Sequence, residues 1–229
     1  MSVSPNINTV NKSFLDTLER SENLCIDMRP YLAPAAAIRA PLKPGQARRI
    51  IAMAFMTNVA AWEEYIQESF IRYLMGAKSP SGYRPSLRLG RCDSRDHAIE
   101  VIAGESNYDL EKNYFLWMNW NVVVRRAKVY FCDGEPFSKI PVGIATLIHD
   151  SYKIRNRVVH SSLMSKKEFK QVALKFRGRQ KDAKLTQGYT VGSLLLETNV
   201  RHFGSFCTGR DYFEAYSNMF RKLADILTP

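Results

Sequence analysis

Cysteine is scarce in this sequence, and its four cysteines, Cys25, Cys92, Cys132 and Cys207, lie far apart. No two of them form a CxxC pair, which argues against a zinc site of the cysteine-rich kind. Widely spaced cysteines are typical of proteins that keep their thiols reduced. We therefore expect a cytoplasmic protein without structural disulfides.

Long apolar runs are missing as well. No stretch of about 18 consecutive apolar residues occurs, so we expect no transmembrane helix and no membrane partner. The first 22 residues lack the apolar core of a signal peptide. A hydrophobic fraction of 45% and an aromatic fraction of 11% still suffice for a packed core, and 229 residues predict one sizeable domain.

Acidic residues are outnumbered, 22 against 33 basic ones, and the net charge is +11. Most of the excess lies in residues 150–184, which hold 11 basic and 3 acidic side chains. Such a patch attracts polyanions, nucleic acid first, although solvated surface cations are a common alternative. The cations expected to contact phosphates are Lys153, Arg157, Lys166, Lys167 and Lys170.

The spacing of apolar residues predicts a mainly α fold. Helices are expected at 7–27, about 46–76, Ser94 to about Ile102, about 118–130, about 140–161, Lys166–Arg177 and Asp211–Leu227. The long helix at 46–76 is apolar nearly all round, which predicts burial on several sides or a subunit interface. An extended linker is expected at 29–44. Residues 105–137 and 185–205 are compatible with helix or strand.

The most informative motif is Arg155-Asn156-Arg157-Val158-Val159-His160, at the end of the predicted helix 140–161. A histidine can transfer a proton near neutral pH. An arginine can stabilise the charge that builds on phosphate oxygens. Together they can cleave a phosphodiester without a metal ion, so we expect no cofactor.

Helical spacing places Arg155 within an apolar stripe formed by Ile144, Leu147, Ile148, Val158 and Val159. A guanidinium there is costly unless it meets a carboxylate or an interface cleft. The alternative is that its long side chain reaches water at the helix edge.

Two further residues are candidates for supporting roles. Glu63 lies on an apolar flank of the long helix and is the better candidate partner for Arg155, whereas Glu64 is expected to face solvent. Both carboxylates could instead simply belong to the polar side of that helix. His149 is expected on the same flank as Asn156 and His160, about two turns from Asn156.

The residues from Arg155 to His160 resemble the R-x4-H motif of the HEPN superfamily, in which Asn often follows the Arg. The upstream segment Ala61-Trp62-Glu63-Glu64-Tyr65-Ile66-Gln67-Glu68 resembles the first core helix of the RiboL-PSP branch and of its relatives in bacterial defence systems. The resemblance covers about residues 46–176. It implies that 1–45 and 178–229 are elaborations of a single HEPN-type helical bundle.

This resemblance implies a homodimer whose two motifs face one cleft, and a metal-independent endoribonuclease that acts as a toxin or antiphage defence effector. Arg155 and His160 would be catalytic, and Asn156 would orient one of them. RNA, with tRNA as one candidate, would be the substrate. An antitoxin or defence-system protein would be a further partner.

One departure and two alternatives accompany this interpretation. Members paired with a nucleotidyltransferase carry Tyr two residues after the His, but Ser161 and Ser162 follow His160 here, so control by tyrosine AMPylation is not expected. A catalytically silent HEPN module that binds nucleic acid or a partner protein is the first alternative. A helical DNA-binding protein is the second, and no helix-turn-helix pattern supports it.

Overall fold

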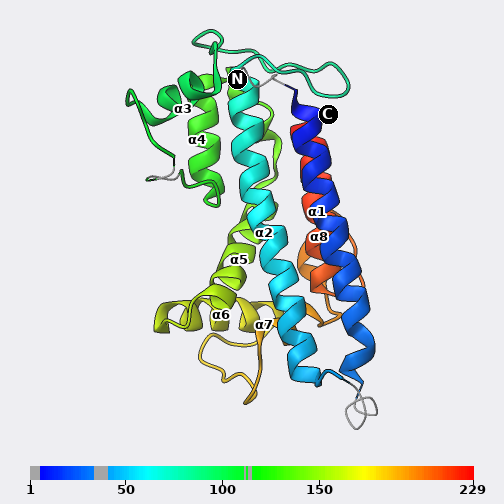
Figure 1. Ribbon diagram of the computed structural model, residues 1–229. Coiled ribbons are helices and arrows are strands. Elements are labelled where there is room, and N and C mark those ends of the chain that lie inside the picture. The colour runs from blue at the N-terminus through cyan, green and yellow to red at the C-terminus, as the bar shows by residue number, and fades with distance from the viewer. Residues whose placement is uncertain (1–5, 34–40, 111, 113–114) are drawn as a thin grey trace. The chain divides into compact units, whose positions relative to one another are not determined.

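The computed structural model describes residues 6–33, 41–110, 112 and 115–229, and this part of the chain is mainly helical. The expectation of a mainly α fold is therefore confirmed, and within the described residues the extended backbone pairs only in an isolated bridge, Leu87 with Phe131. The α-helices, shown in Figure 1, are α1 (Ile7–Met28), α2 (Pro44–Leu74), α3 (Arg95–Ala103), α4 (Trp120–Tyr130), α5 (Val142–Val159), α6 (Leu163–Phe176), α7 (Val191–Leu195) and α8 (Tyr212–Leu227).

Most predicted helices agree with the observed ones to within a few residues. Residues 105–137, which were compatible with helix or strand, contain α4 near the expected helix at about 118–130. Residues 185–205, the other such stretch, contain α7. Of the two candidate caps of α3, Asp93 and Ser94, it is Ser94 whose side chain accepts a hydrogen bond from the backbone N–H of His97. The expected linker begins instead with a short 3₁₀ turn at Arg29–Leu32, and its residues 34–40 lie outside the described part.

The helix expected at about 140–161 is observed as α5, which ends two residues before the expected end, at Val159. Ser162 caps the next helix by accepting a hydrogen bond from the Ser165 N–H, so α6 starts earlier than its apolar spacing suggested. Two helices thus meet in a short turn, and His160 lies in that turn rather than on the flank of a helix.

The described residues divide into two compact units, with residues 6–15, 62–110, 112, 115–148 and 222–229 in unit 1 and residues 16–33, 41–61 and 149–221 in unit 2. The division falls within α1, α2, α5 and α8, so each of these helices supplies residues to both units. The prediction of a single HEPN-like domain over 1–229 stays a prediction.

Unit 1 is built on aromatic side chains of the second half of α2. Trp62 and Tyr65 stack with each other, and both contact the ring of Phe14 from α1. Hydroxyls of α2 bind the end of α8: that of Tyr65 shares a hydrogen bond with Thr228, and that of Tyr73 donates to the Leu227 carbonyl oxygen. These bonds satisfy polar atoms that burial would otherwise leave without partners.

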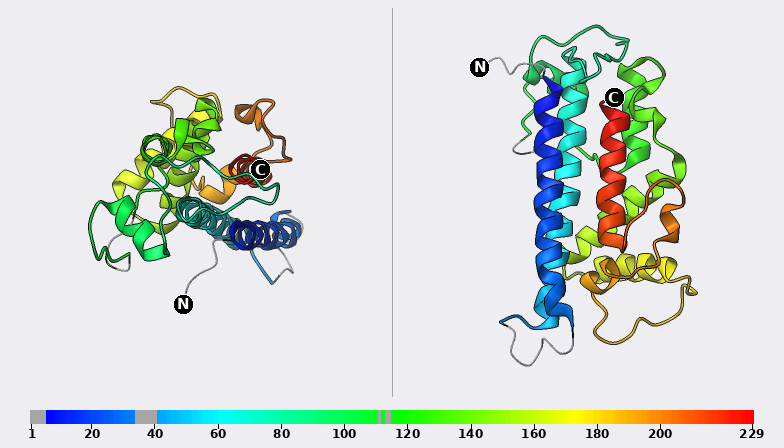
Figure 2. Two further views of the ribbon diagram at one scale, coloured as in Figure 1. Left: turned by 90° about the horizontal axis from the view of Figure 1, so that it is seen from above. Right: turned by 90° about the vertical axis from the view of Figure 1, so that its right-hand side faces the viewer.

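Unit 2 holds the first half of α2 together with α6, α7 and most of α8. In the right-hand view of Figure 2, α6 runs across the direction of α8 rather than along it. Phe176 at the end of α6 stacks on Tyr212 of α8, with ring centroids 4.7 Å apart. Asp211, which is 1% exposed, pairs with Arg29 at 2.6 Å. A buried carboxylate of this kind needs its cation.

The cysteines offer a direct test of this packing. Cys25, Cys92 and Cys207 are buried and Cys132 is exposed, and all four are free thiols. Burial raises the pKa of the Cys25 thiol to about 11, so it stays protonated and unreactive at pH 8. A thiol reagent should modify one cysteine rapidly in the native protein and all four after denaturation. Rapid native labelling that persists in Cys132→Ser would contradict the fold.

Candidate active site

Arg155 projects from the last turns of α5 and is half-buried. Its Nη1 donates to the Oδ1 of Asn156 at 3.2 Å, and the guanidinium carbon lies 5.9 Å from the centroid of the Tyr152 ring. The Nε is buried and has no hydrogen-bond partner among the described residues. Asn156 therefore contacts Arg155 through Nη1, and Nη2 forms no hydrogen bond within the described chain.

The buried apolar face of α5 near Arg155 includes fewer residues than the helical spacing predicted. Ile144, Leu147 and Ile148 are buried, but Val159 is 48% exposed. Ile154, directly before Arg155, is fully buried instead. Because the buried face passes through Ile154, Arg155 lies at the edge of the apolar surface and not at its centre.

His160 is exposed in the turn between α5 and α6. Its carbonyl oxygen accepts hydrogen bonds from Arg157 Nη1 at 3.0 Å and from Ser165 Oγ at 2.8 Å. Its backbone N–H donates to the Asn156 carbonyl oxygen. The backbone is thus held at three points, whereas the imidazole makes no hydrogen bond within the described chain and is open to a ligand.

The two supporting residues fall in different units. His149 belongs to unit 2, and its ring is solvent-accessible. Partial burial lowers the pKa of this imidazole, and the Lys153 charge lowers it further, against a smaller opposing effect of Asp150. Glu63 is half-buried in unit 1, and Glu64 is exposed. The pairing of Glu63 with Arg155 therefore stays a prediction.

The predicted phosphate-binding cations all lie in unit 2, and none forms a salt bridge with a described carboxylate. Arg157 and Lys166 line one cavity. Lys153 lines a second hollow, together with Lys175 and Arg179. Lys167 and Lys170 line neither. Lys175, by contrast, is neutralised by the buried carboxylate of Asp150 at 2.6 Å.

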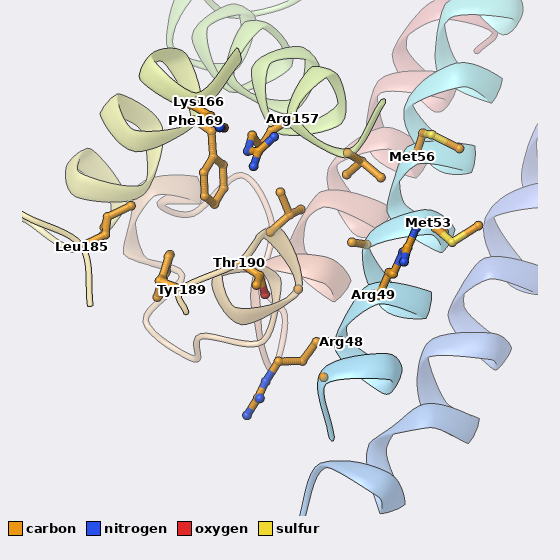
Figure 3. Close-up of a pocket in the computed structure, with 15 residues that line it drawn as sticks. Arg48, Arg49, Met53, Met56, Arg157, Lys166, Phe169, Leu185, Tyr189 and Thr190 are labelled. Atoms are coloured by element: carbon orange, nitrogen blue, oxygen red, sulfur yellow. The ribbon is translucent and has the colours of Figure 1, made fainter. Parts of the chain in front are cut away.

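The first cavity has a volume of about 630 Å³ and brings in residues that the sequence did not single out. Figure 3 shows Arg48, Arg49, Met53 and Met56 on α2, across from Arg157 and Phe169. One signal could have revealed the two arginines. They lie close to the start of a helix, where the helix dipole favours acidic rather than basic side chains.

Comparison of the chain with models of protein families, with curated proteins and with solved structures gives no match. In the described residues, no helix is long and apolar enough to cross a membrane. The same part of the chain has no group of three or more His, Cys, Asp or Glu residues that could hold a metal ion.

The unpaired cations predict a salt-dependent affinity for RNA. Replacing Lys153, Lys167 and Lys170 by Gln should lower the slope of log affinity against log salt by about one unit for each phosphate that the variant no longer binds. Fluorescence anisotropy with labelled RNA would measure the slope. As a control, Arg20→Gln with Arg125→Gln removes exposed charges outside the basic segment 150–184 and should leave the slope unchanged. An unchanged slope in the triple variant would place the RNA elsewhere.

Proposed function

We propose that this protein is a metal-independent endoribonuclease of the HEPN type. The observation that carries the proposal is the end of α5, where the Arg155 guanidinium bonds to Asn156 and an unengaged His160 imidazole follows in the turn. These are the two side chains that the R-x4-H resemblance implies as catalytic. Neighbouring unpaired cations give the surface the charge that an RNA backbone requires.

The chemistry uses the nucleophile that RNA itself supplies. His160 in its neutral form takes the proton of a 2′-hydroxyl, and the oxygen attacks the adjacent phosphorus. Arg155 stabilises the charge on the phosphorane oxygens. The bond from phosphorus to the 5′-oxygen then breaks, and that oxygen takes a proton from a second acid. The products are a 2′,3′-cyclic phosphate and a 5′-hydroxyl.

Two groups are candidates for the second acid. His149 has a lowered pKa and is therefore mostly neutral at pH 7, which makes it a poor proton donor. The second subunit's His160 is the better candidate if two motifs share one cleft. The proposal accordingly includes a homodimer.

The surface around His160 supports this dimer. Leu163 is 84% exposed and Met164 is 65% exposed, and Val159 is half-exposed on the other side of His160. Large apolar side chains in such a group are characteristic of interaction surfaces. The all-round apolar character of α2 adds no support, since in its 31 residues only one large apolar side chain, Met53, is exposed.

A cleavage assay tests the activity. Purified protein in EDTA should cleave tRNA or total RNA and leave 2′,3′-cyclic phosphate or 3′-phosphate ends, while the matching DNA stays intact. Arg155→Ala and His160→Ala should each lower the rate at least roughly a hundredfold while remaining folded by circular dichroism. Toxicity on expression should disappear in the same variants.

Matched controls are His97→Ala and Arg125→Ala, which change the same residue types at exposed positions in unit 1. Both should keep near-wild-type rates. Strict dependence on Mg²⁺, 3′-hydroxyl products, or full activity of His160→Ala would refute the proposal. RNA binding without cleavage would instead favour a catalytically silent module.

The dimer has a separate test. Light scattering should give about twice the chain mass of 26.2 kDa. Leu163→Asp with Met164→Asp should give monomers with little activity, because charges in an apolar interface are costly to bury. Val142→Asp is the matched control, since Val142 is 85% exposed at the opposite end of α5. A fully active monomer at all concentrations would defeat the dimer model.

A further inference from the structure

The cavity of about 630 Å³ in unit 2 is distinct from the pair Arg155 and His160, neither of which lines it. It lies among α2, α5, α6 and α7, and its volume is within the range of small-molecule sites. One wall is tight, because a Cβ atom added at Gly192 would lie 2.1 Å from the Arg48 carbonyl oxygen. Glycine at this position therefore lets α7 pack directly against the backbone of α2.

Charge is the first property of the lining. Four cations contribute to it, Arg48, Arg49, Arg157 and Lys166, and none of the lining residues is Asp or Glu. Within the described chain none of the four forms a salt bridge. Several other arginines do pair with carboxylates, for example Arg29 and Arg221. Four uncompensated positive charges around one cavity favour an anionic ligand.

An apolar surface is the second property. Met53 and Met56 of α2 belong to the lining of the cavity. Phe169 projects from α6 toward Tyr189 and Thr190 (Figure 3). The Phe169 ring stacks with that of Tyr189, with centroids 6.3 Å apart. Met53 is half-exposed, so a ligand would cover apolar surface that water now contacts. A bare inorganic anion would leave this surface uncovered.

We propose that this cavity binds a nucleoside phosphate, with the phosphate among the arginines and the base against Met53, Met56 and Phe169. Guanidinium groups bind phosphate in two-point hydrogen bonds, and bases pack on aromatic and apolar side chains. Arg157 uses Nη1 for the His160 carbonyl oxygen, and the remaining N–H groups of its guanidinium can reach a ligand. The ligand is either a free nucleotide or one unstacked residue of a single-stranded RNA.

Isothermal titration of the full chain with AMP and UMP tests the proposal. We expect saturable binding of at least one of them at one site per chain. Arg48→Gln with Arg49→Gln should weaken this binding by about tenfold or more, since the variant cannot form the hydrogen bonds from guanidinium to phosphate. The control Arg20→Gln with Arg125→Gln removes the same charge at residues that do not line the cavity and should change the affinity by less than about twofold.

Met53→Gln separates a nucleotide site from a simple anion site. It should weaken AMP or UMP binding and leave the weak binding of inorganic phosphate unchanged. A short 2′-O-methyl RNA, which lacks the attacking hydroxyl, distinguishes the two sources. If this RNA competes with the nucleotide, or if it alone binds and its binding depends on Arg48 and Arg49, the natural ligand is a nucleotide within an RNA strand. Nucleotide binding without competition identifies a free ligand.

Three results would overturn the proposal. They are no binding of any of these probes, inorganic phosphate that binds as tightly as the nucleotides, and an effect of Arg48→Gln with Arg49→Gln no larger than that of the control. These measurements require no RNA cleavage, so they stand or fall independently of the ribonuclease assay.

Discussion

The carbonyl oxygen of His160 is the acceptor on which the candidate site depends. It accepts hydrogen bonds from the Ser165 hydroxyl and from the Arg157 guanidinium, while Ser162 caps the following helix. These bonds end α5 at Val159, and α6 begins at Leu163 after three intervening residues. The His160 side chain consequently lies outside both helices and is exposed, one residue beyond the helix that positions Arg155 and Asn156. A helix continued to residue 161 would have placed the imidazole on a helical face instead.

Arg157 contacts both the turn that carries His160 and the cavity of unit 2. One nitrogen of its guanidinium binds the His160 carbonyl oxygen, and the same side chain lines the cavity that also contains Arg48, Arg49 and Lys166. Binding of an anion in the cavity would therefore act on a residue that helps to hold the turn. Arg157, within the R-x4-H motif, thus stabilises the turn and also contributes a positive charge to the cavity.

The basic side chains of residues 150–184 fall into two groups. Lys175 and Arg177 are paired with Asp150 and Glu197, so they contribute to the stability of unit 2. Lys153, Arg157, Lys166, Lys167 and Lys170 form no such pair within the described chain. A count of charges along the sequence gives the same weight to both groups. Only the positions of the carboxylates in space separate cations that hold the fold from cations that remain available to a polyanion.

By itself, the amino-acid sequence determined the helical class, most helix positions and the local order of Arg155, Asn156 and His160. Apolar residues repeat with the helical period, and local caps such as Ser94 act within a few positions, so both can be recognised along the chain. The end of α5 lies two residues before the expected one, because Ser162 caps a new helix where the apolar spacing would allow the first to continue.

The tertiary structure alone decided what lies together. Arg48 and Arg49 are more than a hundred residues from Arg157 and Lys166, yet all four line one cavity. The early arginines of α2 gave only a hint, through their unfavourable position near the helix start. Periodicity likewise could not show that α2 buries nearly all of its large apolar side chains within the chain and leaves Met53 exposed. Contacts between distant segments depend on how whole helices pack, and no local pattern records that packing.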